Sequence, residues 1–131
     1  MKDGLNVLAN GNKHWYLNCK PHRAEGLPAV EYASGSKVWY LNGELLRADG
    51  PAVEYADGSK YWYLNGKYHR TDGPAVEGAD GSKEWYLNDE RHRTDGPAVE
   101  GVNGYKAWYL NGVEYEPQDL EIGGIKMKKK T

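Results

Sequence analysis

Three histidines recur at one place in a repeated motif, and histidine side chains ligate metals and transfer protons. They are His22, His69 and His92, and Leu46 occupies the same place in another copy. A metal site needs ligands that converge on one point. Copies carried by successive hairpins of a sheet would instead lie about 10 Å apart. We therefore expect these histidines to pack in turns, with a pH-dependent or partner contact as the alternative.

Arginine and aspartate form a second repeated set that resembles a catalytic charge pair. The pairs are Arg47 with Asp49, Arg70 with Asp72, and Arg93 with Asp95. An aspartate before glycine typically caps its own turn, and an arginine nearby can stack on an aromatic ring. Catalysis needs one place that differs from all others, whereas these groups have copies. We predict no enzymatic activity, no catalytic residue, no cofactor and no metal.

The single cysteine, Cys19, replaces the glycine of an Asn-Gly turn, so we expect a small turn residue there rather than a reactive thiol. One cysteine cannot form an internal disulfide, which favours a reducing compartment. We also find no signal-like start and no apolar run long enough to span a bilayer. The sequence thus predicts a cytoplasmic protein.

The spacing of these groups follows from a repeat. The stretch "WYLN" begins at five tryptophans with steps of 24, 23, 23 and 23 residues: Trp15, Trp39, Trp62, Trp85 and Trp108. The extra Leu27 in "EGLPAVE" accounts for the step of 24, since the other copies have "DGPAVE". Such a fixed period is typical of repeat architectures. We number the repeats 1 to 5 by these tryptophans.

Each repeat reads as a β-hairpin. The runs "PAVEY" and "KYWYLN" are aromatic and β-branched, and "ADGS" between them is typical of a tight turn. The segment "NGKYHRTDG" then leads through turns to the next repeat. We predict an all-β fold in which five hairpins of about 23 residues form one elongated, twisted antiparallel sheet of about ten strands.

The repeat length, the "NG-x-x-H" turn and the "DGS-K-x-W" hairpin resemble MORN (membrane occupation and recognition nexus) repeats over about 110 of the 131 residues. The "HR-x-DGPA" form is similar to repeats in proteins of phages, mobile elements and large DNA viruses. This resemblance implies an elongated β-sheet that mediates protein association, with lipid binding often proposed for MORN arrays. It also implies an inhibitor that occupies a host protein, for example a defence protein.

Alternation along the strands separates the constant tryptophans, which we expect in the core, from a row of tyrosines beside variable positions. Tyrosines of this kind are enriched at protein interfaces. The alternative is that they merely cover the second side of the sheet. The predicted partner-binding residues are Tyr16, Tyr40, Tyr63, Tyr86, Tyr109, Val38, Tyr61 and Glu84.

The C-terminal segment departs from the repeat, so we divide the chain into a repeat array, residues 1–116, and a cap with a basic tail, residues 117–131. The cap would cover the last strand, whose open edge could otherwise pair with a second copy in a homodimer. The four lysines between Lys126 and Lys130 form a solvated tail, or contact anionic lipid or an acidic protein.

The charge pattern bears on the partner. Four of the seventeen basic residues lie in the last six positions, so acidic side chains exceed basic ones in the rest of the chain. This does not suit nucleic acid, whose phosphates need basic partners. We expect a protein partner. The alternatives are a peripheral phospholipid-associated scaffold and a carbohydrate or small-ligand platform.

Overall fold

The computed structural model describes residues 2–122 and 125–130, and it divides the chain into two compact units, residues 1–67 and 68–131. Both units consist of short antiparallel strands, and within the described residues the only helical segment is a 3-10 turn, Val102–Gly104. The all-β hairpin-repeat fold expected from the sequence is confirmed. The boundary expected between residues 116 and 117 falls within strand β18.

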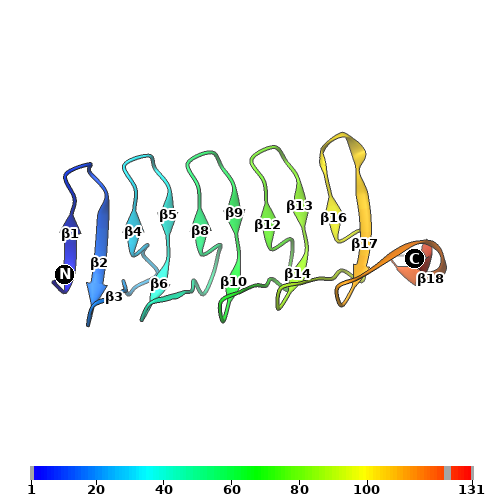
Figure 1. Cartoon of the computed structure of the whole chain (residues 1–131), viewed down its shortest axis with the longest axis horizontal. Helices are drawn as coiled ribbons and strands as arrows, with labels where there is room; N and C mark the ends of the chain where they lie inside the picture. The colour runs from blue at the N-terminus through cyan, green and yellow to red at the C-terminus, as the bar shows by residue number, and fades with distance from the viewer. Residues whose placement is uncertain (1, 123–124, 131) are drawn as a thin grey trace. The chain divides into compact units, whose positions relative to one another are not determined.

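Unit 1 holds three hairpins whose strands run side by side in the order β1-β2-β4-β5-β8-β9 (Figure 1). The bounds are β1 Gly4–Val7, β2 Lys13–Leu17, β4 Val30–Glu31, β5 Lys37–Val38, β8 Val53–Glu54 and β9 Lys60–Tyr61. All pairs are antiparallel, and the same register recurs in each repeat: Val30 faces Val38 within repeat 2, and Val53 faces Tyr61 within repeat 3. The register therefore places equivalent positions of successive repeats in rows across the strands.

The turn of each hairpin has three residues. In repeat 3 the Tyr55 amide donates to Ser59 O (2.9 Å) and the Gly58 amide donates to Tyr55 O (3.0 Å). Gly58 has φ +98°, a value that favours glycine, while the preceding Asp57 has an ordinary φ. Asp57 instead accepts the Ser59 amide on Oδ1 at 2.9 Å. The Asp-Gly pair thus forms a three-residue turn with glycine in the left-handed position.

In repeats 1, 2 and 4 the tryptophan is followed by a second, smaller hairpin, in a segment where a connecting turn was expected. In repeat 2 it comprises β6 (Tyr40–Leu41) and β7 (Glu44–Leu45), which are joined by Asn42 at φ +49° and Gly43 at φ +81°. Two successive positive φ angles define a type I′ turn, which Asn-Gly favours. The predicted number of about two strands per repeat was therefore too low.

The remaining small hairpins have the same form. In repeat 1, β3 (Lys20–Pro21) pairs with β2, and repeat 4 contributes β14 (Tyr86–Leu87) and β15 (Glu90–Arg91). Strand β10 (Tyr63–Leu64) belongs to repeat 3, and β11 (Lys67–Tyr68) spans the residues at which the two units meet in the sequence. Cys19 replaces the turn glycine at φ +64°, and it is exposed, as expected for a turn residue.

Unit 2 has the strand order β12-β13-β16-β17-β18-β19. The bounds are β12 Val76–Glu77, β13 Lys83–Glu84, β16 Val99–Glu100, β17 Lys106–Leu110, β18 Val113–Ile122 and β19 Ile125–Lys129. Strand β18 pairs with β17, and β19 returns along β18. The segment for which a cap and a basic tail were expected thus forms a hairpin next to the last repeat strand.

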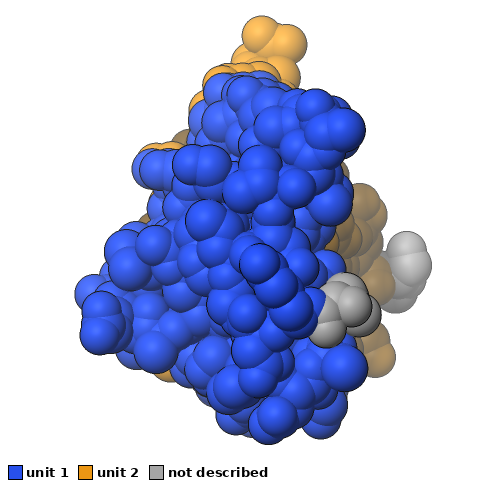
Figure 2. All heavy atoms as spheres, turned by 90° about the vertical axis from the view of Figure 1, so that its left-hand side faces the viewer, with its two compact units in different colours: residues 1–67 blue, residues 68–131 orange. Residues whose placement is uncertain are grey.

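Unit 1 has apolar side chains packed on both faces of its hairpins. Val30, Val38 and Val53 are at most 9% exposed, and Tyr40, Leu45, Tyr61 and Tyr63 pack against them. By alternation, Ala29 beside Val30, Ala52 beside Val53 and Trp39 beside Val38 face the other side, where both alanines are fully buried and Trp39 is 6% exposed. Viewed from the β1 end, unit 1 is narrow above and broad below, where the small hairpins lie (Figure 2).

The burial of Trp39 predicts a large effect of its removal. Trp39→Ala should lower the free energy of unfolding by about 3–5 kcal/mol, because a large buried ring leaves a cavity. Tyr55→Ala is the matched control, since Tyr55 is 51% exposed and should matter much less. Denaturant unfolding measures both, and equal losses would contradict the assignment of Trp39 to the core.

Candidate functional site

Three of the repeated arginines, Arg23, Arg47 and Arg93, stack on the tryptophans of their own repeats. The guanidinium carbon lies 3.8 Å from the ring centroid for Arg23 on Trp15, and 3.8 Å for Arg93 on Trp85. The Arg93 side chain also donates to Pro97 O (3.0 Å), Glu100 Oε2 (2.7 Å) and Asp95 Oδ1 (2.8 Å). Every one of these partners belongs to the motif "HR-x-DGPAVE". The arginine and aspartate therefore hold the repeat together, as the sequence analysis expected.

The glycine of the same motif leaves room for the arginine. A Cβ added to Gly96 would lie 2.9 Å from Arg93 Cζ. A Cβ added to Gly73 would lie equally close to Arg70 Cζ, and one added to Gly50 equally close to Arg47 Cζ. Real Cβ atoms essentially never come so close. The guanidinium of Arg93 thus fits between an indole face and a glycine, which explains why "DG" precedes proline in these repeats.

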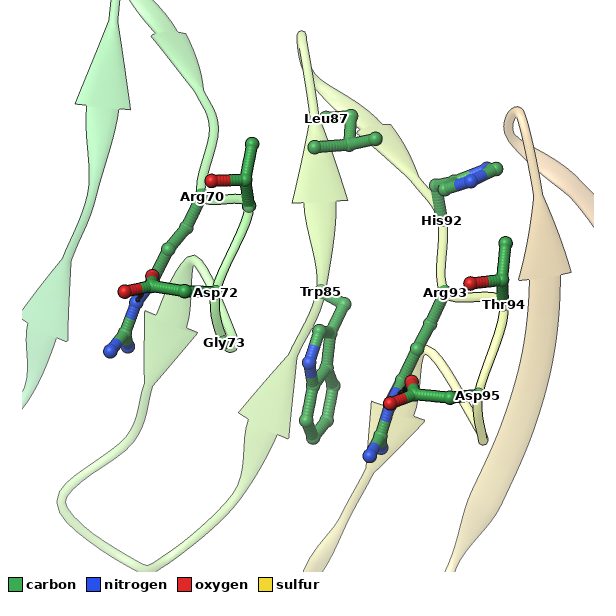
Figure 3. Close-up of a pocket in the computed structure, with 10 residues that line it drawn as sticks. Arg70, Asp72, Gly73, Trp85, Leu87, His92, Arg93, Thr94 and Asp95 are labelled. Atoms are coloured by element: carbon green, nitrogen blue, oxygen red, sulfur yellow. Dashed lines mark hydrogen bonds and ion pairs between the residues drawn. The ribbon is translucent and has the colours of Figure 1, made fainter. Parts of the chain in front are cut away.

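A hollow of about 560 Å³ lies between two such motifs in unit 2, with Trp85 between the segments that carry Arg70 and Arg93 (Figure 3). Its charged groups are already paired, since Arg70 Nε donates to Asp72 Oδ1 (2.9 Å) and Arg93 pairs with Asp95. Among the described residues, no three His, Cys, Asp or Glu side chains are placed to hold a metal ion. The hollow follows from the spacing of successive motifs.

The repeated histidines bind the small hairpin of the following repeat. His22 Nδ1 accepts the Asn42 amide (2.9 Å), His69 Nδ1 accepts the Asn88 amide (3.1 Å), and His92 Nδ1 accepts the Asn111 amide (2.9 Å). The expected packing in turns is therefore a specific side-chain-to-backbone bond between successive repeats. In these three cases the bond holds the amide of the first residue of a type I′ turn.

A shallow groove of about 450 Å³ occupies the other face of unit 1. Its lining residues are Tyr32, Ser34, Ser36, Val38, Tyr40, Leu45, Val53, Tyr55 and Tyr63, and we call them the tyrosine groove. None of them carries a charge. Tyr32 and Tyr55, at equivalent positions of repeats 2 and 3, are 40% and 51% exposed. Both rings thus offer aromatic surface to a ligand.

The Tyr40 hydroxyl of this groove stays protonated. Burial, and then the neighbouring Tyr32 and Tyr55, raise the pKa of Tyr40 above its ordinary value of 10. A protonated phenol donates a hydrogen bond. Tyr40 therefore presents a hydroxyl donor at neutral and mildly alkaline pH.

The same face in unit 2 has different chemistry. Glu84 occupies the position of Val38, and Arg91 that of Leu45. Arg91 Nη2 lies 2.9 Å from Glu84 Oε1, and its guanidinium carbon lies 5.8 Å from the Tyr86 ring centroid and 5.3 Å from that of Tyr109. Burial and Glu84 raise the pKa of Tyr86. An ion pair thus replaces the apolar contact of repeat 2.

The predicted partner-binding residues fall into two sets. Unit 1 brings Tyr40 and Tyr63 into one groove with Val38, and it places Tyr61 edge-to-face with Tyr55 at 5.6 Å. Tyr16 stacks on His14 at 6.1 Å between ring centroids. Unit 2 holds Tyr86, Tyr109 and Glu84 around Arg91. Val38 itself is only 9% exposed, so it supports the groove from below.

The sequence analysis missed Tyr32 and Tyr55 as groove residues. The signal was present, because in "AVEY" the tyrosine lies two residues after the valine and alternation places both on one face. It also missed Leu45 and Arg91, because they belong to the small hairpins that it did not predict.

No protein-family model, curated protein or solved structure matches the chain. None of the helical segments within the described residues has the length and apolar character needed to cross a membrane.

The contact between Gly96 and Arg93 predicts the effect of one methyl group. Gly96→Ala should destabilise the protein by about 1–3 kcal/mol, because the new Cβ displaces the guanidinium from Trp85. In an Arg93→Ala background the same substitution should cost much less, since nothing is left to displace. Chemical denaturation of both single variants and the double variant measures this coupling, and strict additivity would contradict it.

Repeat 4 has Glu84 and Arg91 at the positions of Val38 and Leu45 in repeat 2. We therefore predict that substitutions of Glu84 and Arg91 compensate each other. Glu84→Val alone and Arg91→Leu alone should each destabilise by about 1 kcal/mol, because each leaves a half-buried charge without its partner. The double variant should regain most of this loss, since it recreates the contact of repeat 2. Thermal and denaturant unfolding measure the stability of all three variants. The prediction is wrong if the double variant loses as much stability as the two single variants lose together.

Proposed function

We propose that this chain is a non-catalytic protein-binding repeat module whose contact surface is the tyrosine groove of unit 1. The observation that carries the proposal is the set of uncharged, half-exposed tyrosines around a buried valine floor. Aromatic side chains supply large contact area and are enriched at the centres of protein interfaces. The valines beneath hold them in place, so little conformational freedom is lost on binding.

The chemistry of the other face supports the same choice. The arginine, aspartate and histidine side chains bond to groups of their own repeat or of the next one. Such groups stabilise the fold, and their use as ligands would break these bonds. The groove instead offers a partner the exposed rings of Tyr32 and Tyr55.

The partner class is proposed by resemblance. Repeats of the "HR-x-DGPA" form are similar to those of phage, mobile-element and large-virus proteins. We extend the proposal to an inhibitor that occupies a surface of a host protein, such as a defence protein, in the host cytoplasm. This extension rests on the repeat form alone.

A groove variant tests the proposal. Tyr32→Ser with Tyr55→Ser should weaken binding of a captured protein partner at least about tenfold, because two aromatic anchors are lost. Both residues are partly exposed, so the fold should survive, and far-UV circular dichroism verifies it.

Tyr105→Ser is the matched control, since Tyr105 is 60% exposed and lies outside the groove. Calorimetry with the purified partner compares the variants at equal folded fraction. A partner whose affinity the groove variant leaves unchanged would contradict the proposal.

A further inference from the structure

We infer that the tyrosine groove takes a proline-rich segment of the partner in the polyproline II conformation, running across the strands. This inference rests on the proposed function and specifies the ligand. Three observations carry it: the neutral lining, the hydroxyl donors and the spacing of the repeats.

The lining residues of the groove favour an uncharged ligand segment over a charged one. The groove has no lysine, arginine, aspartate or glutamate among its lining residues, whereas the equivalent face of unit 2 holds Glu84 and Arg91. A charged side chain buried against tyrosine and valine would lose hydration without an opposite charge to replace it. An uncharged segment is therefore complementary to this groove.

The polar groups of the groove are hydroxyls. Tyr32, Tyr40 and Tyr55 present phenolic groups, and the Ser36 hydroxyl accepts the Ala56 amide at 2.9 Å. A polyproline II segment has no internal hydrogen bonds, so its carbonyl groups are free to accept, and its prolines have no N–H that needs an acceptor. Sugar hydroxyls, in contrast, both donate and accept hydrogen bonds. Carboxylate and amide side chains would therefore match a carbohydrate better than tyrosine hydroxyls alone. Donor hydroxyls over aromatic rings thus favour proline-rich backbone over carbohydrate.

The spacing of the repeats matches the ligand. Strands β4 and β8 are two strands apart in the order β4-β5-β8, which corresponds to about 9.6 Å. One turn of polyproline II contains three residues and spans about 9.3 Å. A segment that crosses the strands therefore places every third residue over an equivalent tyrosine, first Tyr32 and then Tyr55. Aromatic-lined grooves recognise proline-rich segments in this way.

A titration with defined peptides tests the inference. Dodecaproline is the probe, a twelve-residue Gly-Ser peptide is the flexible control, and maltohexaose is the carbohydrate control. We expect that dodecaproline binds saturably and that the two control ligands do not. Chemical-shift changes of the tyrosine ring signals measure the binding. Tyr55→Ser should weaken it at least about tenfold, and Tyr105→Ser should leave it unchanged.

A second comparison separates ring from hydroxyl and tests the spacing. Tyr32→Phe and Tyr55→Phe keep the ring and the fold, and each should cause a smaller loss of affinity than the serine variant. A peptide with proline at every third position should bind more tightly than one of the same length and composition in which the prolines are unevenly spaced. Equal affinity of these two peptides would overturn the proposed register.

The outcomes distinguish this inference from the proposed function. If dodecaproline fails to bind the folded protein at millimolar concentration while the groove variant still loses its protein partner, the proline-rich ligand is wrong and the proposed function stands. Binding of maltohexaose that depends on Tyr55 would overturn both. Dodecaproline binding that Tyr55→Ser leaves intact would overturn the inference, because the peptide would then bind elsewhere.

Discussion

The stacking of Arg23, Arg47 and Arg93 on the tryptophans of their own repeats is the contact on which this fold depends. In repeats 1, 2 and 4 the guanidinium lies 3.8–3.9 Å from the indole centroid, and it binds a proline carbonyl and a glutamate at the entrance of the next hairpin. A cation over tryptophan contributes about 0.5–2 kcal/mol, more where it is shielded from water. One side chain thus joins two successive hairpins, and the same contact recurs along the chain.

This contact explains why so much of the sequence is constant. The arginine fixes the tryptophan that it covers, the glycine that makes room for it, and the proline and glutamate that it binds. The opposite face is not constrained in this way. Its cross-strand positions change together, from Val38 with Leu45 to Glu84 with Arg91, because each side chain needs only to suit its neighbour. This exchange of an apolar pair for a charged pair therefore lies on the tyrosine side.

The sequence predicted the hairpin repeat, the structural role of arginine and aspartate, and the two faces, because period and alternation determine them directly. It did not predict the small hairpins, although Asn42-Gly43 between two aromatic or aliphatic pairs was a hairpin signal. The pairing of Glu84 with Arg91 follows from that hairpin, so it was missed as well. The loop that contains the inserted Leu27 could not be predicted either. In this loop Gly26 O accepts the Trp39 indole N–H at 2.9 Å, and only the three-dimensional path of the chain reveals this bond.

A repeat fold of this kind determines which ligands are compatible with it. Equivalent groups recur about 10 Å apart along each unit. A ligand with its own repeat can therefore contact equivalent groups in turn. Unit 1 combines this spacing with a neutral aromatic lining, whereas unit 2 has the ion pair of Arg91 with Glu84 beside the rings of Tyr86 and Tyr109. The two units therefore present different surfaces, and the chemistry of each follows from one cross-strand pair.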